Sequence, residues 1–185
     1  IEKIAFEKCG IIKNNVPVIT SSNQHKDALK VIKETCESKD CDLIITNPYK
    51  TEILDDSIFG TLFSYDENVY KTKLTGNHQI ENTVNAIECA KVLKLSDNAI
   101  AQGIENTRMI ARMEIINEKP LVIRDGGHNE GCAEALYNFL TKYNVQNINL
   151  LIGLMADKDV EGYVEKIVPL CNSVITVTPS NPRAL

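Results

Sequence analysis

The feature that most constrains the fold of this 185-residue chain is its alternation of short apolar runs with segments of helical period. Residues 16–20 form an apolar run, residues 24–38 repeat apolar side chains every four positions, and residues 41–46 form a second apolar run. Strand, helix and strand at this spacing form a βαβ unit, whose parallel strands lie in a sheet covered by helices. The pattern therefore predicts an α/β fold.

Further elements are predicted up to Met109. Residues 50–74 have strand character on both sides of a turn at residues 66–68, which predicts a hairpin. Residues 79–95 predict a long helix whose apolar face consists of Ile80, Val84, Ile87, Ala90 and Leu93. Ser96 is the expected cap of a shorter helix that runs through Gly103.

The alternation restarts after Met109. Strands are expected at residues 114–116, 121–124, 148–154 and 173–178, and helices at residues 129–143 and 159–170. This order is that of a doubly wound, Rossmann-like sheet, of which only the first half would be present. We place a domain boundary near Ile110, so that residues 1–109 and 110–185 belong to two domains.

Charge and composition narrow the class of protein. The formal net charge of −5 lacks the basic footprint of a nucleic-acid binder. No apolar run reaches the roughly 18 residues of a membrane span, and no signal segment opens the chain, so we expect a cytoplasmic protein without a membrane partner. Six cysteines occur without a C-x-x-C pair, and we expect most of them to be buried or half-buried. Because the chain starts at Ile1 and stops soon after a strand-like run, we also expect it to be a fragment.

Polar residues follow two of the predicted strands, at residues 125–129 and 157–159. Ligands bind at the carboxyl ends of strands in doubly wound sheets, and a helix N-terminus offers backbone N–H groups to an anion. The alternative is structural: Asp125 and Asn129 shape a turn and cap a helix while His128 is solvated. Neither common phosphate-binding glycine motif occurs, so any triphosphate loop would lie outside this chain.

Six short segments follow one another along nearly the whole chain. They are Ile4–Lys13, Gly76–Asn82, Arg112–Glu114, Asp125–Asn129, Asp157–Asp159 and Asn181–Ala184. In this order they resemble the segments I-A-x-E-K-A-G-I-I-K, G-x-H-Q-x-x-N-A, P-G-R-x-E, D-G-A-H-N, D-K-D and N-P-R-A of the folylpolyglutamate synthase and dihydrofolate synthase family, which shares the Mur ligase architecture. The departures are Cys9, Thr83, Ala111 and Gly127, which stand where the family has Ala, Ala, Gly and Ala.

The resemblance implies both an architecture and a reaction. Residues 1–109 would be the end of a central ATPase domain, and residues 110–185 would be the first half of the C-terminal glutamate-ligase domain. The whole enzyme would be a monomer that uses ATP and Mg²⁺ to join L-glutamate to the γ-carboxylate of a folate through an acyl phosphate. The chain by itself is expected to be inactive, because the phosphate loop lies upstream in the family.

The resemblance also implies roles for single residues. Gln79 and Asn82 would contact the adenine, and Arg112 would contact the ATP phosphates, for which its planar fork is suited. Asp125 would contact ATP through the ribose hydroxyls or through a cation, and it counts with the catalytic residues. His128 would meet the transferring phosphate or the incoming glutamate.

Lys8 corresponds to a lysine that the family carries as a carbamate, which helps to hold magnesium. Carbamate formation needs a neutral amine, so we expect Lys8 to be partly buried. Its oxygens would be hard ligands of the kind that magnesium prefers. The alternative is a surface lysine paired with Glu7.

Three other functions stay open. A dihydrofolate synthase or a bifunctional enzyme shares these motifs, and a peptidoglycan-precursor ligase is less favoured. The chain could also be a nucleotide-contacting module without catalysis. A phosphate loop in the parent reading frame would favour the ligase.

Overall fold

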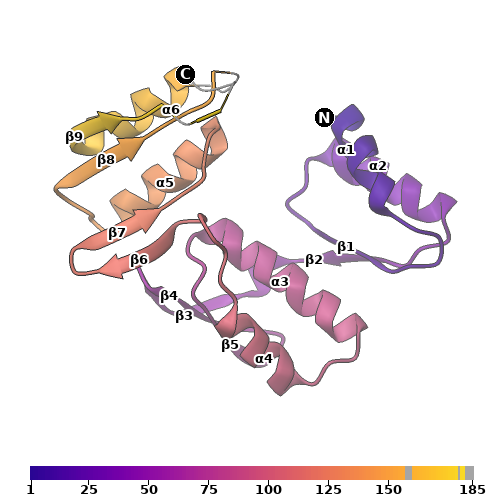
Figure 1. Cartoon of the computed structure of the whole chain (residues 1–185). Coiled ribbons are helices and arrows are strands. Elements are labelled where there is room, and N and C mark those ends of the chain that lie inside the picture. The colour runs from indigo at the N-terminus through magenta and orange to yellow at the C-terminus, as the bar shows by residue number, and fades with distance from the viewer. Residues whose placement is uncertain (157–159, 179, 182–185) are drawn as a thin grey trace. The chain divides into compact units, whose positions relative to one another are not determined.

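The computed structural model describes residues 1–156, 160–178, 180 and 181, and the chain divides into two compact units (Figure 1). Unit 1 comprises Ile1–Asp56, Gly60–Lys73 and Asn77–Thr107, and unit 2 comprises Ser57–Phe59, Leu74–Gly76 and Arg108–Leu185. Among the described helices, none combines the length and the apolar character needed to cross a membrane.

Unit 1 begins with the predicted βαβ unit. Strands β1 (Val18–Ser21) and β2 (Leu43–Thr46) pair in parallel and are joined by α2 (Lys26–Ser38). Helix α1 (Glu2–Lys8), followed by the 3₁₀ turn η1 (Cys9–Ile11), packs on α2 and was not expected from the sequence.

A small sheet and two helices complete unit 1. The sheet has the order β3 (Glu52–Ser57), β4 (Gly60–Tyr65), β5 (Asn68–Thr72), and η2 (Pro48–Lys50) precedes it. Strand β4 alternates in burial, so one of its faces packs against α3 (Asn77–Val92) and α4 (Asp97–Asn106) (Figure 1). The shared core contains Phe63, Tyr65, Tyr70, Ile80, Val84, Ile87, Ile100 and Ile104.

The end of α3 differs from the prediction at one residue. Ile80, Val84 and Ile87 are buried as expected, but Leu93 is 72% exposed. The helix ends at Val92, and Lys94 has φ = 57°, so the chain leaves the helical path before Leu93 can join the apolar face. The predicted cap of the next helix is confirmed, since the Ser96 hydroxyl accepts the Ala99 N–H.

The predicted hairpin is confirmed as β4 and β5, which pair antiparallel from Thr61↔Thr72 to Tyr65↔Asn68. Its two turn residues, Asp66 and Glu67, have φ values of 51° and 63°, as in a type I′ turn. Side chains other than glycine lie in this left-handed region at a cost of about 1–2 kcal/mol each. Lys91 of α3 offsets part of this cost, because it forms an ion pair with Asp66.

We expect Glu67→Gly to raise the free energy of unfolding by about 0.5–1 kcal/mol, because glycine removes the left-handed strain at a small entropic cost. Denaturant unfolding measures this change. The control is Val69→Gly at an exposed site in β5, where loss of stability is expected. A lower unfolding midpoint for Glu67→Gly would contradict the assigned strain.

Unit 2 follows the predicted alternation. Strands β6 (Glu114–Glu118) and β7 (Leu121–Arg124) form an antiparallel pair, and β8 (Ile148–Ile152) and β9 (Cys171–Thr176) form a parallel pair. Helices α5 (Glu130–Lys142) and α6 (Val160–Ile167), with η3 (Val168–Leu170), cover them. The core contains Met113, Ala133, Leu136, Phe139, Leu140, Tyr163 and Ile167.

The strand ladders of unit 2 are more divided than expected. The sequence pattern places residues 121–124 and 148–154 in one sheet, but among the described residues β7 pairs with β6 and β8 pairs with β9. Residues 157–159, which carry the second polar strand end, lie outside the described residues. The proposed meeting of the two strand ends at one sheet edge therefore stays a prediction.

Candidate functional site

Asp125 binds two backbone N–H groups that lie on different segments of unit 2. Its Oδ2 accepts the Met113 N–H at 2.8 Å, and its Oδ1 accepts the Gly127 N–H at 2.7 Å. Charged hydrogen bonds of this kind are short and strong. The carboxylate therefore joins the segment before β6 to the loop after β7, a structural task that needs an acceptor at this position.

The segment before β6 has a strained backbone. Ala111 has φ = 55° and Met113 has φ = 43°, both in the region that favours glycine. The resembled family has glycine at the position of Ala111. In this chain an alanine adopts the positive φ that glycine adopts at lower cost. The Ala111 carbonyl accepts the Gly126 N–H at 2.9 Å, which holds this segment against the loop.

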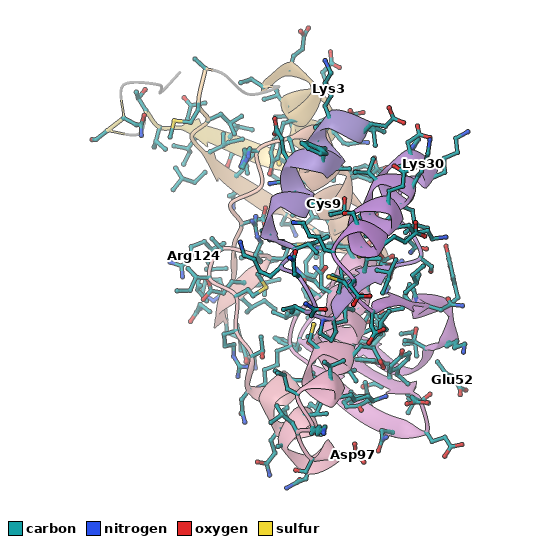
Figure 2. The ribbon with its side chains drawn as sticks, turned by 90° about the vertical axis from the view of Figure 1, so that its right-hand side faces the viewer. Lys3, Cys9, Lys30, Glu52, Asp97 and Arg124 are labelled. Carbon is teal, nitrogen blue, oxygen red and sulfur yellow. The ribbon has the colours of Figure 1, made fainter. Side chains whose placement is uncertain are left out.

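Glu114 completes the same network. Its Oε2 accepts the Ala111 N–H at 2.9 Å and hydrogen bonds from Arg124 at 2.8 and 3.1 Å; Arg124 is labelled in Figure 2. The Ala111 N–H, and next the Arg124 guanidinium, hold the pKa of Glu114 below its ordinary value. Sequence analysis named Glu114 only as part of a motif and missed this contact, because it did not pair the two predicted strands on which Glu114 and Arg124 face each other.

Gly127 has no room for a side chain. A Cβ atom there would lie 2.5 Å from Asp125 Oδ1 and 2.7 Å from the Cys132 Cβ. The resembled family has alanine at this position. This chain has glycine, and Asp125 and Cys132 approach it closely. An alanine would require one of these two residues to move.

The loop after Gly127 leads into α5. The Asn129 side chain accepts the Cys132 N–H at 2.9 Å and so caps the helix. His128 is exposed, with its Nδ1 3.1 Å from the Gly126 carbonyl oxygen. These are the turn and cap contacts of the structural alternative, and they leave the outer part of the His128 ring open to a ligand.

Arg112 lies between the two strained residues and is exposed. Within the described part of the chain, no hydrogen bond or ion pair of its side chain is recorded. Its guanidinium is therefore free to meet an anion, but the structure does not bring it into contact with His128 or Asp125.

Gln79 and Asn82 lie together in unit 1. They occupy the first turns of α3, and the Asn82 Nδ2 donates to Gln79 Oε1 at 3.2 Å. Gln79 is 3% exposed, while Asn82 is exposed, so the pair presents the Asn82 amide to solvent. The predicted nearness of these two amides is observed, and their contact with adenine stays a prediction.

Lys8, at the end of α1, is exposed, so the expectation of partial burial is wrong. It lines a cavity of about 400 Å³ whose other walls are mainly apolar, including Ile4, Ile12 and Val18. Lys8 is the last residue of α1, and its side chain is in contact with solvent. Among the described residues, no group of three or more His, Cys, Asp or Glu side chains could hold a metal ion.

Tyr163 is a residue of this region that sequence analysis missed. It lies on α6, is 5% exposed, and its burial, with the nearby Asp125 and Cys132 groups, raises its pKa to about 12. In the sequence, Tyr163 is distinguished only by its place on the apolar face of a predicted helix.

This raised pKa predicts a dependence of stability on pH. The neutral phenol is favoured in the folded state, so Tyr163 contributes stability below pH 10 that is lost as the pH rises from 10 through about 12. Denaturant unfolding across this range should show a steeper alkaline loss in the wild type than in Tyr163→Phe. Absorbance titration of the phenolates is the second measurement, and equal alkaline loss in both proteins would contradict the assignment.

The cysteines agree with the sequence prediction in most positions. Cys9 and Cys36 are buried, Cys41, Cys132 and Cys171 are half-buried, and all six thiols are free. Cys89 is exposed, since it lies on the outer face of α3.

Comparison with known proteins identifies a domain and several relatives. Residues 111–185 match the family described as the Mur ligase, glutamate ligase domain. The chain is similar to the dihydrofolate synthase/folylpolyglutamate synthase of Bacillus subtilis (strain 168), with 27% identity over 100% of this chain and 46% of that protein. The chain spans about half the length of the curated relatives that it matches.

Solved structures agree with these sequence matches. The folylpolyglutamate synthase of Thermotoga maritima superposes with a TM-score of 0.84 and 30% identity, over 98% of this chain and 45% of that one. A solved FPGS–AMPPCP–folate complex superposes with a TM-score of 0.79 and 26% identity, over 96% of this chain and 46% of that one. The predicted α/β fold class is thereby confirmed. The chain therefore contains a Mur ligase glutamate ligase domain at residues 111–185 and is homologous, along its whole length, to folylpolyglutamate synthases and dihydrofolate synthases.

Proposed function

We propose that this chain is part of an ATP-dependent ligase that adds L-glutamate to the γ-carboxylate of a tetrahydrofolate. The observation that carries the proposal is the superposition of nearly the whole chain on a folylpolyglutamate synthase bound to AMPPCP and folate. Residues 1–109 would contribute to the ATP-binding domain, and residues 110–185 to the glutamate-ligase domain.

The proposed reaction has two steps. The γ-carboxylate oxygen attacks the γ-phosphorus of ATP, which gives an acyl phosphate and ADP. The glutamate amine then attacks the acyl carbon, phosphate leaves, and the amine loses a proton as the amide forms. Both steps gather anions, so fixed positive charge and hydrogen-bond donors must lower the barrier.

Three exposed groups of this chain suit such a reaction. The Asn82 amide offers both a donor and an acceptor to an adenine edge, and Gln79 holds it in place. Arg112 offers an exposed planar fork to phosphate oxygens. His128, at the start of α5, would contact the transferring phosphate or the incoming glutamate, next to backbone N–H groups of the helix.

Asp125 is suited both to contact the ribose and to position the loop before His128. Each of its oxygens accepts one backbone N–H, so each keeps a lone pair that could receive a ribose hydroxyl. The same carboxylate fixes the backbone of residues 126 and 127 just before His128. We propose that it positions this loop and contacts the ribose.

The magnesium of this reaction would be held by the ATP phosphates and by a small number of protein groups, as is usual for this ion. A carbamate on the exposed Lys8 would add hard oxygen ligands to such a site. By resemblance to the family, this magnesium ion would neutralise charge on the ATP phosphates.

The test uses the full-length protein with ATP, magnesium, L-glutamate and tetrahydrofolate. We expect mass spectrometry to find a folate one glutamate heavier, with one ADP and one phosphate released per amide. A second reaction replaces tetrahydrofolate by dihydropteroate, because the Bacillus relative is named for both activities. Glutamylation of dihydropteroate alone would make the protein a dihydrofolate synthase, and no product in either reaction would contradict the ligase proposal.

A further inference from the structure

The end of α2 has a backbone conformation that brings two cysteines together. Asp40 has φ = 52°, the Cys41 N–H donates to the Cys36 carbonyl at 3.0 Å, and the Asp40 N–H donates to the Glu37 carbonyl at 3.4 Å. These three features define a Schellman motif. In this motif the side chains at the positions of Cys36 and Cys41 lie next to each other, and usually they form an apolar contact.

Two other helices of the chain end in the same way and show what normally fills these positions. At the end of α3 the Leu95 N–H donates to the Ala90 carbonyl at 3.1 Å, and at the end of α5 the Val145 N–H donates to the Leu140 carbonyl at 2.9 Å. Both pairs are apolar, and Leu140 and Val145 pack together in the core of unit 2. At α2 alone among these three helix ends, the pair carries two thiols.

The surroundings of the two thiols differ in exposure. Cys36 is 2% exposed and belongs to a small apolar cluster against which Cys41 packs. Burial, and next the nearness of Cys41, raises the pKa of the Cys36 thiol. Cys41 is half-buried and donates its S–H to the carbonyls of Lys13 and Lys39 at 3.0 and 3.4 Å. A reagent in solution would therefore meet Cys41 first.

We propose that Cys36 and Cys41 form a thiol pair that closes to a disulfide when it meets a low-molecular-weight disulfide. The Cys41 thiolate attacks one sulfur of the reagent, the reagent S–S bond breaks, and one thiolate leaves. The Cys36 thiol then loses its proton and attacks the Cys41 sulfur, which expels the second reagent thiolate. Two protein thiols are oxidised and one reagent disulfide is reduced to two thiols.

Cys9 is the competing partner, because it lies in the same apolar cluster. It belongs to η1, at the end of α1 beside α2 (Figure 2). The Cys41 N–H donates to the Cys36 carbonyl, but no recorded backbone hydrogen bond joins Cys9 to Cys36 or to Cys41. Only the Cys36 and Cys41 positions have their backbone separation set by the helix end, and disulfides tolerate a narrow range of such separations.

Closure of this bond has a structural consequence. The single S–H that Cys41 shares between the carbonyls of Lys13 and Lys39 is lost, so both carbonyls lose this donor. Lys13 follows the segment that carries Lys8 and η1. The redox state of the pair would thus change how α2 and β2 hold that segment.

The test treats the reduced 185-residue chain with glutathione disulfide, blocks the remaining thiols and digests with trypsin. Cleavage after Lys39 separates the peptides 34–39 and 40–50, so only a disulfide can hold them together. We expect these two peptides to be linked, whether or not the exposed Cys89 carries glutathione. Linkage of the Cys9 peptide to either of them, or glutathione that stays on Cys41, would overturn the proposal.

Cysteine variants test whether the bond depends on the helix-end geometry or only on the reactivity of the thiols. Cys9→Ala should close the bond at the wild-type rate, while Cys41→Ser should lose the linked peptides and slow the loss of the second thiol at least tenfold. Far-ultraviolet circular dichroism checks that both are folded. In a Cys36→Ser, Cys41→Ser background, Ala90→Cys with Leu95→Cys should form the equivalent bond, and its failure to do so would contradict the role of the shared helix-end geometry.

Discussion

Replacing Asp125 by alanine is expected to lower the stability of unit 2 by about 3 kcal/mol, because two backbone N–H groups lose a charged acceptor. The affected donors are Met113 and Gly127, which bind the two oxygens of the same carboxylate. Unfolding in denaturant measures the loss. Faster hydrogen exchange at these two amides should accompany it.

Two variants control this experiment. Asp125→Asn keeps one acceptor oxygen and should lose about half as much stability. Glu118→Ala removes an exposed carboxylate from β6 of the same unit and should change the unfolding midpoint little. An Asp125→Ala chain with the wild-type midpoint and unchanged amide exchange would mean that the carboxylate does not hold the loop.

Replacing Arg112 by alanine in the full-length enzyme is expected to lower ligase turnover by roughly two orders of magnitude, in line with the loss of one preorganised donor to developing charge. The free energy of unfolding should stay unchanged within about 0.5 kcal/mol, because the side chain is exposed and no hydrogen bond or ion pair is recorded for it among the described residues. Steady-state kinetics and denaturant unfolding of the same preparation give both values.

Arg112→Ala is expected to lower turnover without lowering stability, whereas Asp125→Ala is expected to lower stability. Arg112→Lys keeps the charge but loses the bidentate fork, so an intermediate turnover is expected. Wild-type turnover in Arg112→Ala would remove Arg112 from the proposed phosphate contacts. A large loss of stability would instead assign it a structural role that the folded chain does not show.

Local signals in the sequence were enough to predict most elements. Ser96 and Asn129 cap α4 and α5 because a short polar side chain before a helix can reach an unpaired backbone N–H. The hairpin of β4 and β5 follows from alternating apolar residues on either side of polar turn residues. These features depend on neighbours within a few residues, so the amino-acid sequence by itself determined them. The family resemblance is likewise carried by short ordered motifs.

Tertiary structure decided which groups meet across longer distances. Asp125 and Met113 are twelve positions apart and share no helical or strand period. Glu114 and Arg124 face each other across the β6–β7 pair, a register that became known only with the structure. The exposure of Lys8 likewise depends on what packs against α1 and not on its neighbours in sequence. Hydrogen bonds and burial of this kind are set by the approach of separate segments, for which a single sequence carries no periodic signal.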